Sequence, residues 1–188
     1  MTPNTGIKLS DSCNNTITAN QITNNKQLNG SSGIVFGSSY VLGGAYQNSI
    51  FGNNITGLHY VFRVEGNSSG NSVYANNFLN YSQPMLSTTD KHMMNFWDNG
   101  AVGNYWSTYD GADANQDGIG NTPYMLDLHD KDNFPLMVPA NASSASSASA
   151  TTPEVSSALT TSEFTPAVGV ALIVIVVVLC LLFRKEVV

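Results

Sequence analysis

Positive charge and cysteine are both scarce in this chain. Its 188 residues include 7 Lys and Arg against 13 Asp and Glu, so the formal net charge is −6 at pH 7. Proteins that bind nucleic acid need a basic surface, and this composition therefore argues against nucleic acid as a partner. The two cysteines, Cys13 and Cys180, exclude a disulfide-rich scaffold.

A secretory signal peptide is also missing, because residues 1–10 are polar and contain no apolar stretch. A surface protein needs such a signal, which leaves two hypotheses. The chain is the C-terminal part of a longer protein, or it is tail-anchored with its N-terminus in the cytosol. Tail anchoring would carry Arg184 and Lys185 across the membrane against the positive-inside rule, so we favour the first hypothesis.

One long apolar run stands near the C-terminus. Residues 167–183 read AVGVALIVIVVVLCLLF, followed by Arg184 and Lys185. A bilayer span needs about 17–25 apolar residues, so we expect one transmembrane helix at 167–183 and a cytoplasmic tail at 184–188. A buried core helix is the alternative, but the run has no polar positions at helical spacing. Residues 139–166 are rich in Ser, Thr and Ala and are expected to form a stalk.

The part before the stalk contains an internal repeat. Asn15–Ile22 reads NTITANQI and recurs as NSIFGNNI at Asn48–Ile55 and as NSVYANNF at Asn71–Phe78. Short apolar strands separated by Gly and Asn turns at a period in the low twenties indicate a solenoid. We expect the asparagines to occupy left-handed turn positions and to bond to one another up the stack. Unrelated hairpins with Asn-rich turns are the alternative.

These coils resemble the right-handed parallel β-helix of the NosD/CASH family. The segments NFWDNG at 95–100, GNYWSTY at 103–109, DGIGNTPY at 117–124 and DNFPLM at 132–137 resemble the C-terminal end of NosD-like archaeal surface proteins. The resemblance implies an all-β fold, with β-helix coils at 1–95 and a C-terminal cap at 96–138. The family's name also implies copper, for which the His92-Met93-Met94 tripeptide offers imidazole and thioether ligands.

The cap segment contains the first half of a calcium loop. Oxygen-bearing side chains alternate from Asp113 to Asp117, and Gly118 permits a sharp turn. Tyr124 stands where a closing Glu is expected, so Asp110 or Asp127 would have to complete the shell. An Asp/Asn/Gly turn without an ion is the alternative. The candidate calcium ligands are Asp113, Asn115, Asp117, Ile119, Asn121 and Asp127.

Four aromatic residues of the cap, Trp97, Tyr105, Trp106 and Tyr109, are compatible with two roles. They could stack on a carbohydrate, or they could close the open end of the solenoid, which solenoids require. We favour the closing role.

Catalysis is not expected, because glycoside hydrolysis needs two carboxylates that flank the bond and the coils show no evident pair. Arg63 and Glu65 on one strand face are the only hint of lyase chemistry, and a surface ion pair explains them equally. The sequence therefore predicts a membrane-anchored extracellular protein that binds carbohydrate or surface partners. A fragment of a polysaccharide-acting enzyme and a copper-handling envelope protein are the alternatives. N-glycosylation sequons begin at Asn14, Asn29, Asn54, Asn67, Asn80 and Asn141.

Overall fold

The computed structural model describes residues 4–24, 29–39, 43–88 and 94–140 of the chain. This part is all-β and contains no helix. Its strands are β1 (Thr5–Ser10), β2 (Thr16–Thr18), β3 (Gln21–Thr23), β4 (Ser32–Gly37), β5 (Ser49–Phe51), β6 (Asn54–Thr56), β7 (Tyr60–Val64), β8 (Ser72–Tyr74), β9 (Asn77–Leu79), β10 (Gln83–Ser87), β11 (Tyr105–Trp106), β12 (Tyr124–Met125) and β13 (Lys131–Asp132).

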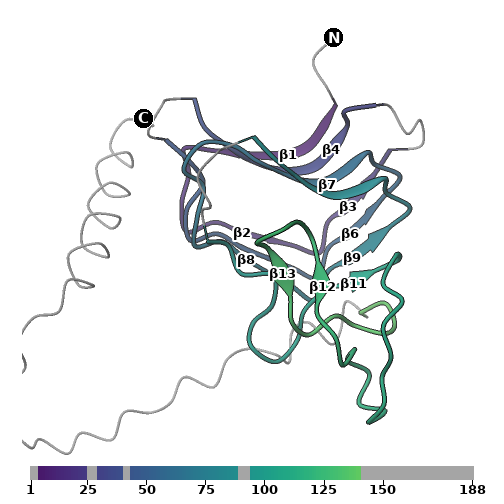
Figure 1. Ribbon diagram of the computed structural model, residues 1–188. Helices are drawn as coiled ribbons and strands as arrows, with labels where there is room; N and C mark the ends of the chain where they lie inside the picture. Colours follow the sequence, from purple (N-terminus) through teal and green to yellow (C-terminus); the bar gives the residue numbers. More distant parts are fainter. Residues whose placement is uncertain (1–3, 25–28, 40–42, 89–93, 141–188) are drawn as a thin grey trace, which may run out of the picture. The chain divides into compact units, whose positions relative to one another are not determined.

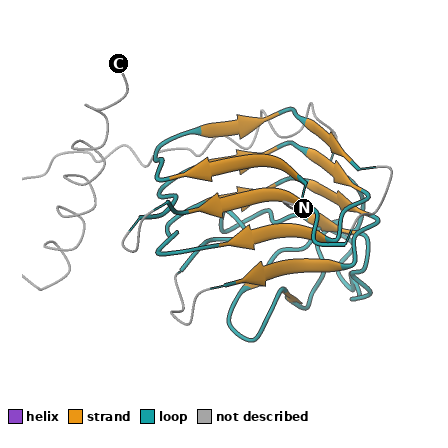
Figure 2. Ribbon diagram, turned by 90° about the horizontal axis from the view of Figure 1, so that it is seen from above, coloured by secondary structure: helices purple, strands orange, loops and turns teal. Residues whose placement is uncertain are grey.

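The strands wind into a β-solenoid with three parallel sheets. The first sheet has the order β1-β4-β7-β10, the second β2-β5-β8 and the third β11-β9-β6-β3. Each of the first three coils contributes one strand to every sheet, and every pairing between coils is parallel. Figure 1 shows the coils stacked in sequence order, and Figure 2 shows the long strands of the first sheet side by side. The expected parallel β-helix is confirmed.

Two apolar columns fill the corner between the second and third sheets. Ile17, Ile50 and Val73 are partners in register on one strand of each coil. The other column consists of Ile22, Ile55 and Phe78, which are likewise partners. The members in the second and third coils are at most 1% exposed, whereas Ile17 and Ile22 in the first coil are half-buried. Stacking thus buries side chains that three-residue strands could not bury alone.

Two ladders of asparagine side chains run along the solenoid, one at each corner of the second sheet. In each ladder, the Nδ2 of one asparagine donates to the Oδ1 of the asparagine in the next coil, at 2.8–3.0 Å. One ladder consists of Asn15, Asn48, Asn71 and Asn95, and the other of Asn20, Asn53, Asn76 and Asn104. The predicted bonding between stacked asparagines is confirmed.

The prediction that these asparagines occupy left-handed turn positions is wrong. In the first three coils the residue before each ladder asparagine has the positive φ instead, as at Gln47 with 52° and Ala75 with 52°. This turn places the asparagine so that its backbone N–H and its Nδ2 both reach the same Oδ1 of the next coil, as Asn48 does with Asn71 at 3.0 and 2.8 Å. The ladder bonds therefore require the positive φ at the residue before the asparagine and not at the asparagine itself.

The cap begins with an incomplete fourth coil. Strand β11 pairs with β9, and Phe96 forms a bridge with Ser72. Leu136 then lies parallel to Tyr105 as a further layer, and β12 and β13 form an antiparallel pair.

Among the described residues, no helix is long and apolar enough to span a bilayer. Only residues 139 and 140 of the predicted stalk are described. The rest of the stalk, the predicted transmembrane helix and the predicted tail lie outside the described residues.

Candidate functional site

Both tryptophans of the cap donate hydrogen bonds to carboxylates in or next to β13. The Trp97 indole N–H donates to Asp130 Oδ1 at 2.7 Å, and the Trp106 indole N–H donates to Asp132 Oδ2 at 2.8 Å. Both rings belong to the core, with Trp97 2% and Trp106 1% exposed. Trp106 stacks on Tyr124 with ring centroids 4.8 Å apart and an interplanar angle of 19°. These contacts join the fourth coil to the hairpin that follows it.

Asp132 is a fully buried carboxylate whose oxygens accept four hydrogen bonds. Its Oδ2 accepts from the backbone and side-chain nitrogens of Asn104 and from Trp106, and its Oδ1 accepts from the Phe134 N–H. Burial raises the pKa of the Asp132 carboxyl to about 6, although the hydrogen bonds from Trp106, Asn104 and Phe134 act in the opposite direction. The carboxylate ends the second asparagine ladder.

The two tyrosines among the predicted stacking residues are half-buried rather than buried. Tyr105 lies on β11, while the Tyr109 hydroxyl donates to the carbonyl of Thr122 at 2.7 Å. Since the Trp97 and Trp106 rings lie in the core, stacking by this group would depend on the tyrosines. Carbohydrate stacking there stays a prediction.

The predicted calcium loop folds around its own polar side chains. Asp113 accepts the backbone N–H groups of Asp117 and Gly118, at 3.1 and 2.9 Å. Asn115 donates to Asp117 Oδ2 at 2.7 Å and accepts from Asn121 Nδ2 at 3.3 Å. The side chains of Asn115, Asp117 and Asn121 thus converge, as ligands of a hard cation must.

The other two candidate ligands have structural roles in the loop region. Ile119 forms a bridge with Leu136, and its N–H donates to Asp117 Oδ1 at 2.8 Å. Asp127 Oδ1 accepts the N–H groups of His129 and Asp130, each at 2.7 Å. Within the described residues, no group of three His, Cys, Asp or Glu could hold a metal ion. Calcium binding stays a prediction.

A cavity of about 210 Å³ opens between the start of the fourth coil and the hairpin of the cap. Met94, Asn95, Phe96, Trp97, Asp98, His129, Asp130, Lys131 and Asn133 line it. The Met94 side chain is 64% and Phe96 is 50% exposed. Asp98 Oδ2 accepts from both nitrogens of Asn133, at 3.1 and 2.9 Å, which holds the two walls together.

This cavity unites residues that the sequence analysis kept apart. Met94 ends the predicted copper tripeptide, whose other members, His92 and Met93, lie outside the described residues. His129 follows 35 positions later and shares the cavity with Met94. No local sequence pattern predicts that Met94 and His129 line the same cavity. Their shared position depends on two long-range hydrogen bonds, from Trp97 to Asp130 and from Asn133 to Asp98.

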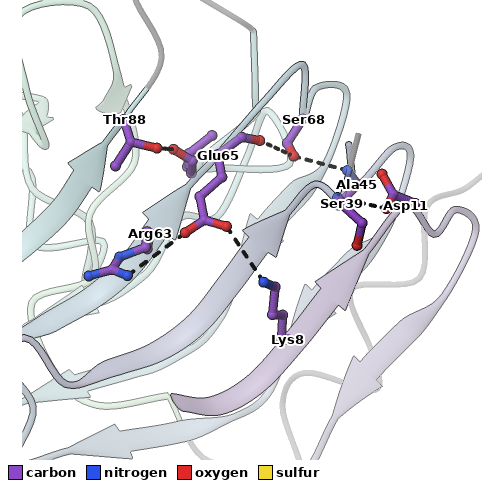
Figure 3. Close-up of polar contacts among 9 residues, drawn as sticks. Lys8, Asp11, Ser39, Ala45, Arg63, Glu65, Ser68 and Thr88 are labelled. Carbon is purple, nitrogen blue, oxygen red and sulfur yellow. Dashed lines mark hydrogen bonds and ion pairs between the residues drawn. The ribbon is translucent and has the colours of Figure 1, made fainter. Parts of the chain in front are cut away.

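The outer face of the first sheet carries a small ionic cluster, shown in Figure 3. Glu65 lies between Lys8 and Arg63, with oxygen-to-nitrogen distances of 3.7 and 3.8 Å. Nearby, Asp11 accepts the Ser39 N–H at 2.8 Å. The two acids of the described coils, Asp11 and Glu65, therefore each interact with a donor or a cation. Arg63 and Glu65 form the surface ion pair that the sequence analysis gave as the alternative to lyase chemistry.

Comparison with known proteins identifies the family. A family model described as periplasmic copper-binding protein (NosD) matches residues 2–111. No curated protein and no solved structure matches the chain. The matched range holds the coils and the first wall of the cavity, whereas His129 and the rest of the second wall lie beyond it. Because the match covers more than half of the 188 residues, this chain belongs to the NosD family of parallel β-helix proteins.

Proposed function

We propose that this chain is a non-catalytic binding protein of the cell envelope and that its cap cavity binds copper. The carrying observation is that Met94 and His129 line one cavity although they are 35 positions apart in the sequence. The family description as periplasmic copper-binding protein agrees with this ligand and with the envelope as the location.

The donor chemistry of the cavity supports copper over harder cations. Thioether and imidazole groups suit copper, whereas carboxylates suit calcium and magnesium. Asp98 and Asp130 are already hydrogen-bonded, to Asn133 and Trp97 respectively. The Met94 thioether and the His129 imidazole are therefore the groups that we assign to the metal, and the exposure of Met94 leaves its sulfur within reach of an ion from solution.

Metal titration of the purified full-length chain tests this proposal. We expect Cu(I), supplied under reducing conditions with a competing chelator, to bind with one equivalent. Met94→Leu and His129→Gln should each weaken binding by at least about tenfold, because losing a metal ligand costs more than 1.4 kcal/mol. The matched control is His59→Gln, since His59 packs against Tyr60 outside the cavity. Equal binding by all variants would refute the site.

The acids of the coils support a binding role rather than glycoside hydrolysis. Hydrolysis needs two carboxylates free to act as acid and as base or nucleophile. Glu65 is held between two cations, and Asp11 accepts a backbone N–H.

A glycan is the second candidate ligand, and Phe96 favours it. Phe96 is 50% exposed and lines the cavity together with Asn133 and Lys131. An exposed ring beside amide and charged groups is a common arrangement for stacking on a sugar. Calorimetric titration with envelope oligosaccharides separates the two ligands. Phe96→Ala should abolish sugar binding and spare copper, whereas Met94→Leu should do the reverse.

We further propose that the protein carries calcium in its Asp113–Asn121 loop and is anchored in the membrane by residues 167–183. Converging side chains support the first proposal, and the uncharged run followed by Arg184 and Lys185 supports the second.

A further inference from the structure

The first turn of the cap contains an asparagine followed by a glycine, a dipeptide that the sequence has at two places. These are Asn29-Gly30 and Asn99-Gly100. In this dipeptide the backbone nitrogen of the glycine can attack the side-chain amide of the asparagine, because glycine has no Cβ that hinders the approach. Asn99 and Gly100 are both exposed, and a Cβ at Gly100 would meet nothing within 4 Å. The turn at 99–100 is therefore open to water and sterically unhindered.

The nitrogen that would attack is hydrogen-bonded to a carboxylate. The Gly100 N–H donates to Asp98 Oδ1 at 2.9 Å. This nitrogen must lose its proton to attack, and a carboxylate within hydrogen-bond reach can accept the proton as a general base. The Asp98 side chain is itself held in place, because its Oδ2 accepts from both nitrogens of Asn133, at 3.1 and 2.9 Å. The base is thus positioned at the proton that it would remove.

The amide group that would be attacked accepts two hydrogen bonds from the backbone. The N–H groups of Ala101 and Val102 donate to Asn99 Oδ1 at 3.0 and 2.8 Å. Attack on the Asn99 Cγ places negative charge on this oxygen, and preorganised N–H donors stabilise such an oxyanion. Residues 98–102 therefore bring together a nucleophile, a base and two oxyanion donors in one turn.

We propose that Asn99 is a site of spontaneous deamidation and that the folded turn accelerates the reaction. The Gly100 nitrogen gives its proton to Asp98 and forms a bond to the Asn99 Cγ. The bond from Cγ to Nδ2 then breaks, and Nδ2 takes the proton from Asp98 and leaves as ammonia. Water opens the resulting succinimide ring to give aspartate or isoaspartate at position 99.

The modification would change the turn next to the cavity. Either product adds one negative charge beside Asp98, which lines the cavity. Isoaspartate also adds a carbon to the backbone of the turn that the bond from the Asn99 N–H to the Val102 carbonyl closes at 3.1 Å. The reaction needs no ligand in the cavity, so the proposal does not depend on the proposed copper site.

Peptide mass spectrometry of the purified full-length chain, incubated at neutral pH, tests this proposal. Asn29 is the internal reference, because it is exposed and precedes a glycine, but no carboxylate of the described residues accepts the Gly30 N–H. We expect Asn99 to be converted at least about tenfold faster than Asn29, because a positioned general base contributes about a hundredfold or more. Unfolding the chain in urea should slow the conversion of Asn99 and remove this difference.

Two variants separate catalysis by Asp98 from a structural effect. Asp98→Asn keeps an oxygen that accepts the Gly100 N–H but removes the base, so the conversion of Asn99 should slow at least about tenfold. The matched control is Asn133→Ala, which removes the contact of Asp98 with the other wall of the cavity and retains the carboxylate. This control should leave the rate of conversion unchanged.

Three results would overturn the proposal. One is conversion of Asn99 no faster than that of Asn29 in the folded chain. Another is faster conversion of Asn99 in urea than in the folded chain, which would show that the turn protects the residue. The third is an equal rate for Asp98→Asn and Asn133→Ala, which would show that Asp98 does not act as the base.

Discussion

Asn104 donates its backbone N–H to Asp132 Oδ2 at 2.7 Å and its side-chain Nδ2 to the same oxygen at 3.3 Å. Every earlier member of this ladder makes the same pair of contacts with an asparagine of the next coil, as Asn53 does with Asn76 at 3.0 and 2.9 Å. A carboxylate accepts hydrogen bonds but donates none when ionised. Asp132 therefore satisfies the last asparagine without needing a further coil, and this makes it the end of the stack.

Asp132 should make the stability of the domain depend on pH. Burial raises its folded-state pKa to about 6 from the ordinary value of 3.8. A raised folded pKa contributes stability that is complete below pH 4 and is lost as the pH rises through 6. We expect the free energy of unfolding to fall by on the order of 3 kcal/mol between pH 4 and pH 7 on this account. Thermal unfolding across this range, compared with Asp132→Asn, measures it. Parallel pH profiles of the two proteins would contradict the assignment to Asp132.

Gly103 is required for the close approach of the Asp132 carboxylate. A Cβ at position 103 would lie 1.8 Å from Asp132 Oδ1 and 2.4 Å from its Cγ. Gly103→Ala should therefore cost about 2–3 kcal/mol of stability through overpacking, measured by denaturant unfolding. Gly100→Ala is the control, since its Cβ would meet nothing within 4 Å and only its φ of 87° is strained. That variant should lose about 1 kcal/mol, and equal losses would argue against the steric explanation.

The asparagine ladders predict a graded response to alanine substitution. Asn71 is fully buried, and its loss leaves the Asn48 backbone N–H without its acceptor and removes one hydrogen bond each from Asn48 Nδ2 and the Ala45 carbonyl. Asn71→Ala should cost roughly 2–4 kcal/mol, because each buried group left without a partner costs about 1–3 kcal/mol. Asn15 is exposed at the first coil, so Asn15→Ala should cost less than about 1 kcal/mol. Urea unfolding of both variants checks the difference, and similar costs would show that the ladder bonds contribute little.

Calcium should stabilise the cap if it binds the Asp113–Asn121 loop. An ion that binds only the folded state raises stability by mass action, about 2.7 kcal/mol at a hundred times its dissociation constant. Thermal unfolding with calcium and with chelator should differ for the unaltered chain but not for Asp117→Ala. Asp110→Ala and Asp127→Ala then decide which carboxylate closes the shell. A midpoint that calcium does not change would remove the proposal.

The topology of the C-terminus can be tested on intact cells. If residues 167–183 span the membrane with Arg184 and Lys185 inside, added protease should remove the solenoid and spare a tag placed after Val188. A control digestion of lysed cells should destroy both. Digestion of the tag while the solenoid survives would show a tail-anchored protein.

The coil register could be predicted from the sequence because it repeats two signals together. The asparagines mark the corners, and the apolar residue two positions after each one marks the core, so Ile50 aligns with Val73 and Ile55 with Phe78. The left-handed positions could not be predicted. Ala75 and Gln47 carry no preference for positive φ, and the bonds of the asparagines that follow them, Asn76 and Asn48, depend on the next coil.

The corner that holds the extra residues of the second coil could not be predicted from the repeat. Asn15 and Asn48 are 33 positions apart and Asn48 and Asn71 are 23 apart, and the structure divides the extra residues between the segment before β4 and the long connection from β4 to β5. Insertions at the corners leave the strand register unchanged, so a repeat pattern does not distinguish one corner from another. The cap cavity could not be predicted for a similar reason, because its walls are separated in sequence and joined by side-chain bonds.

The ladders also give the stack a direction of assembly. The backbone N–H of each ladder asparagine donates toward the C-terminal side, although the side chain also donates to the preceding coil, as Asn53 does to the Ile17 carbonyl. A coil that has just left the ribosome therefore still lacks the acceptors for its corner backbone N–H groups. Those acceptors arrive one coil later, and the last of them in the second ladder is Asp132. Synthesis runs from the N-terminus, yet this series of donors closes only after that carboxylate has been made. The second ladder is therefore closed at its C-terminal end, after all of its asparagines have been translated.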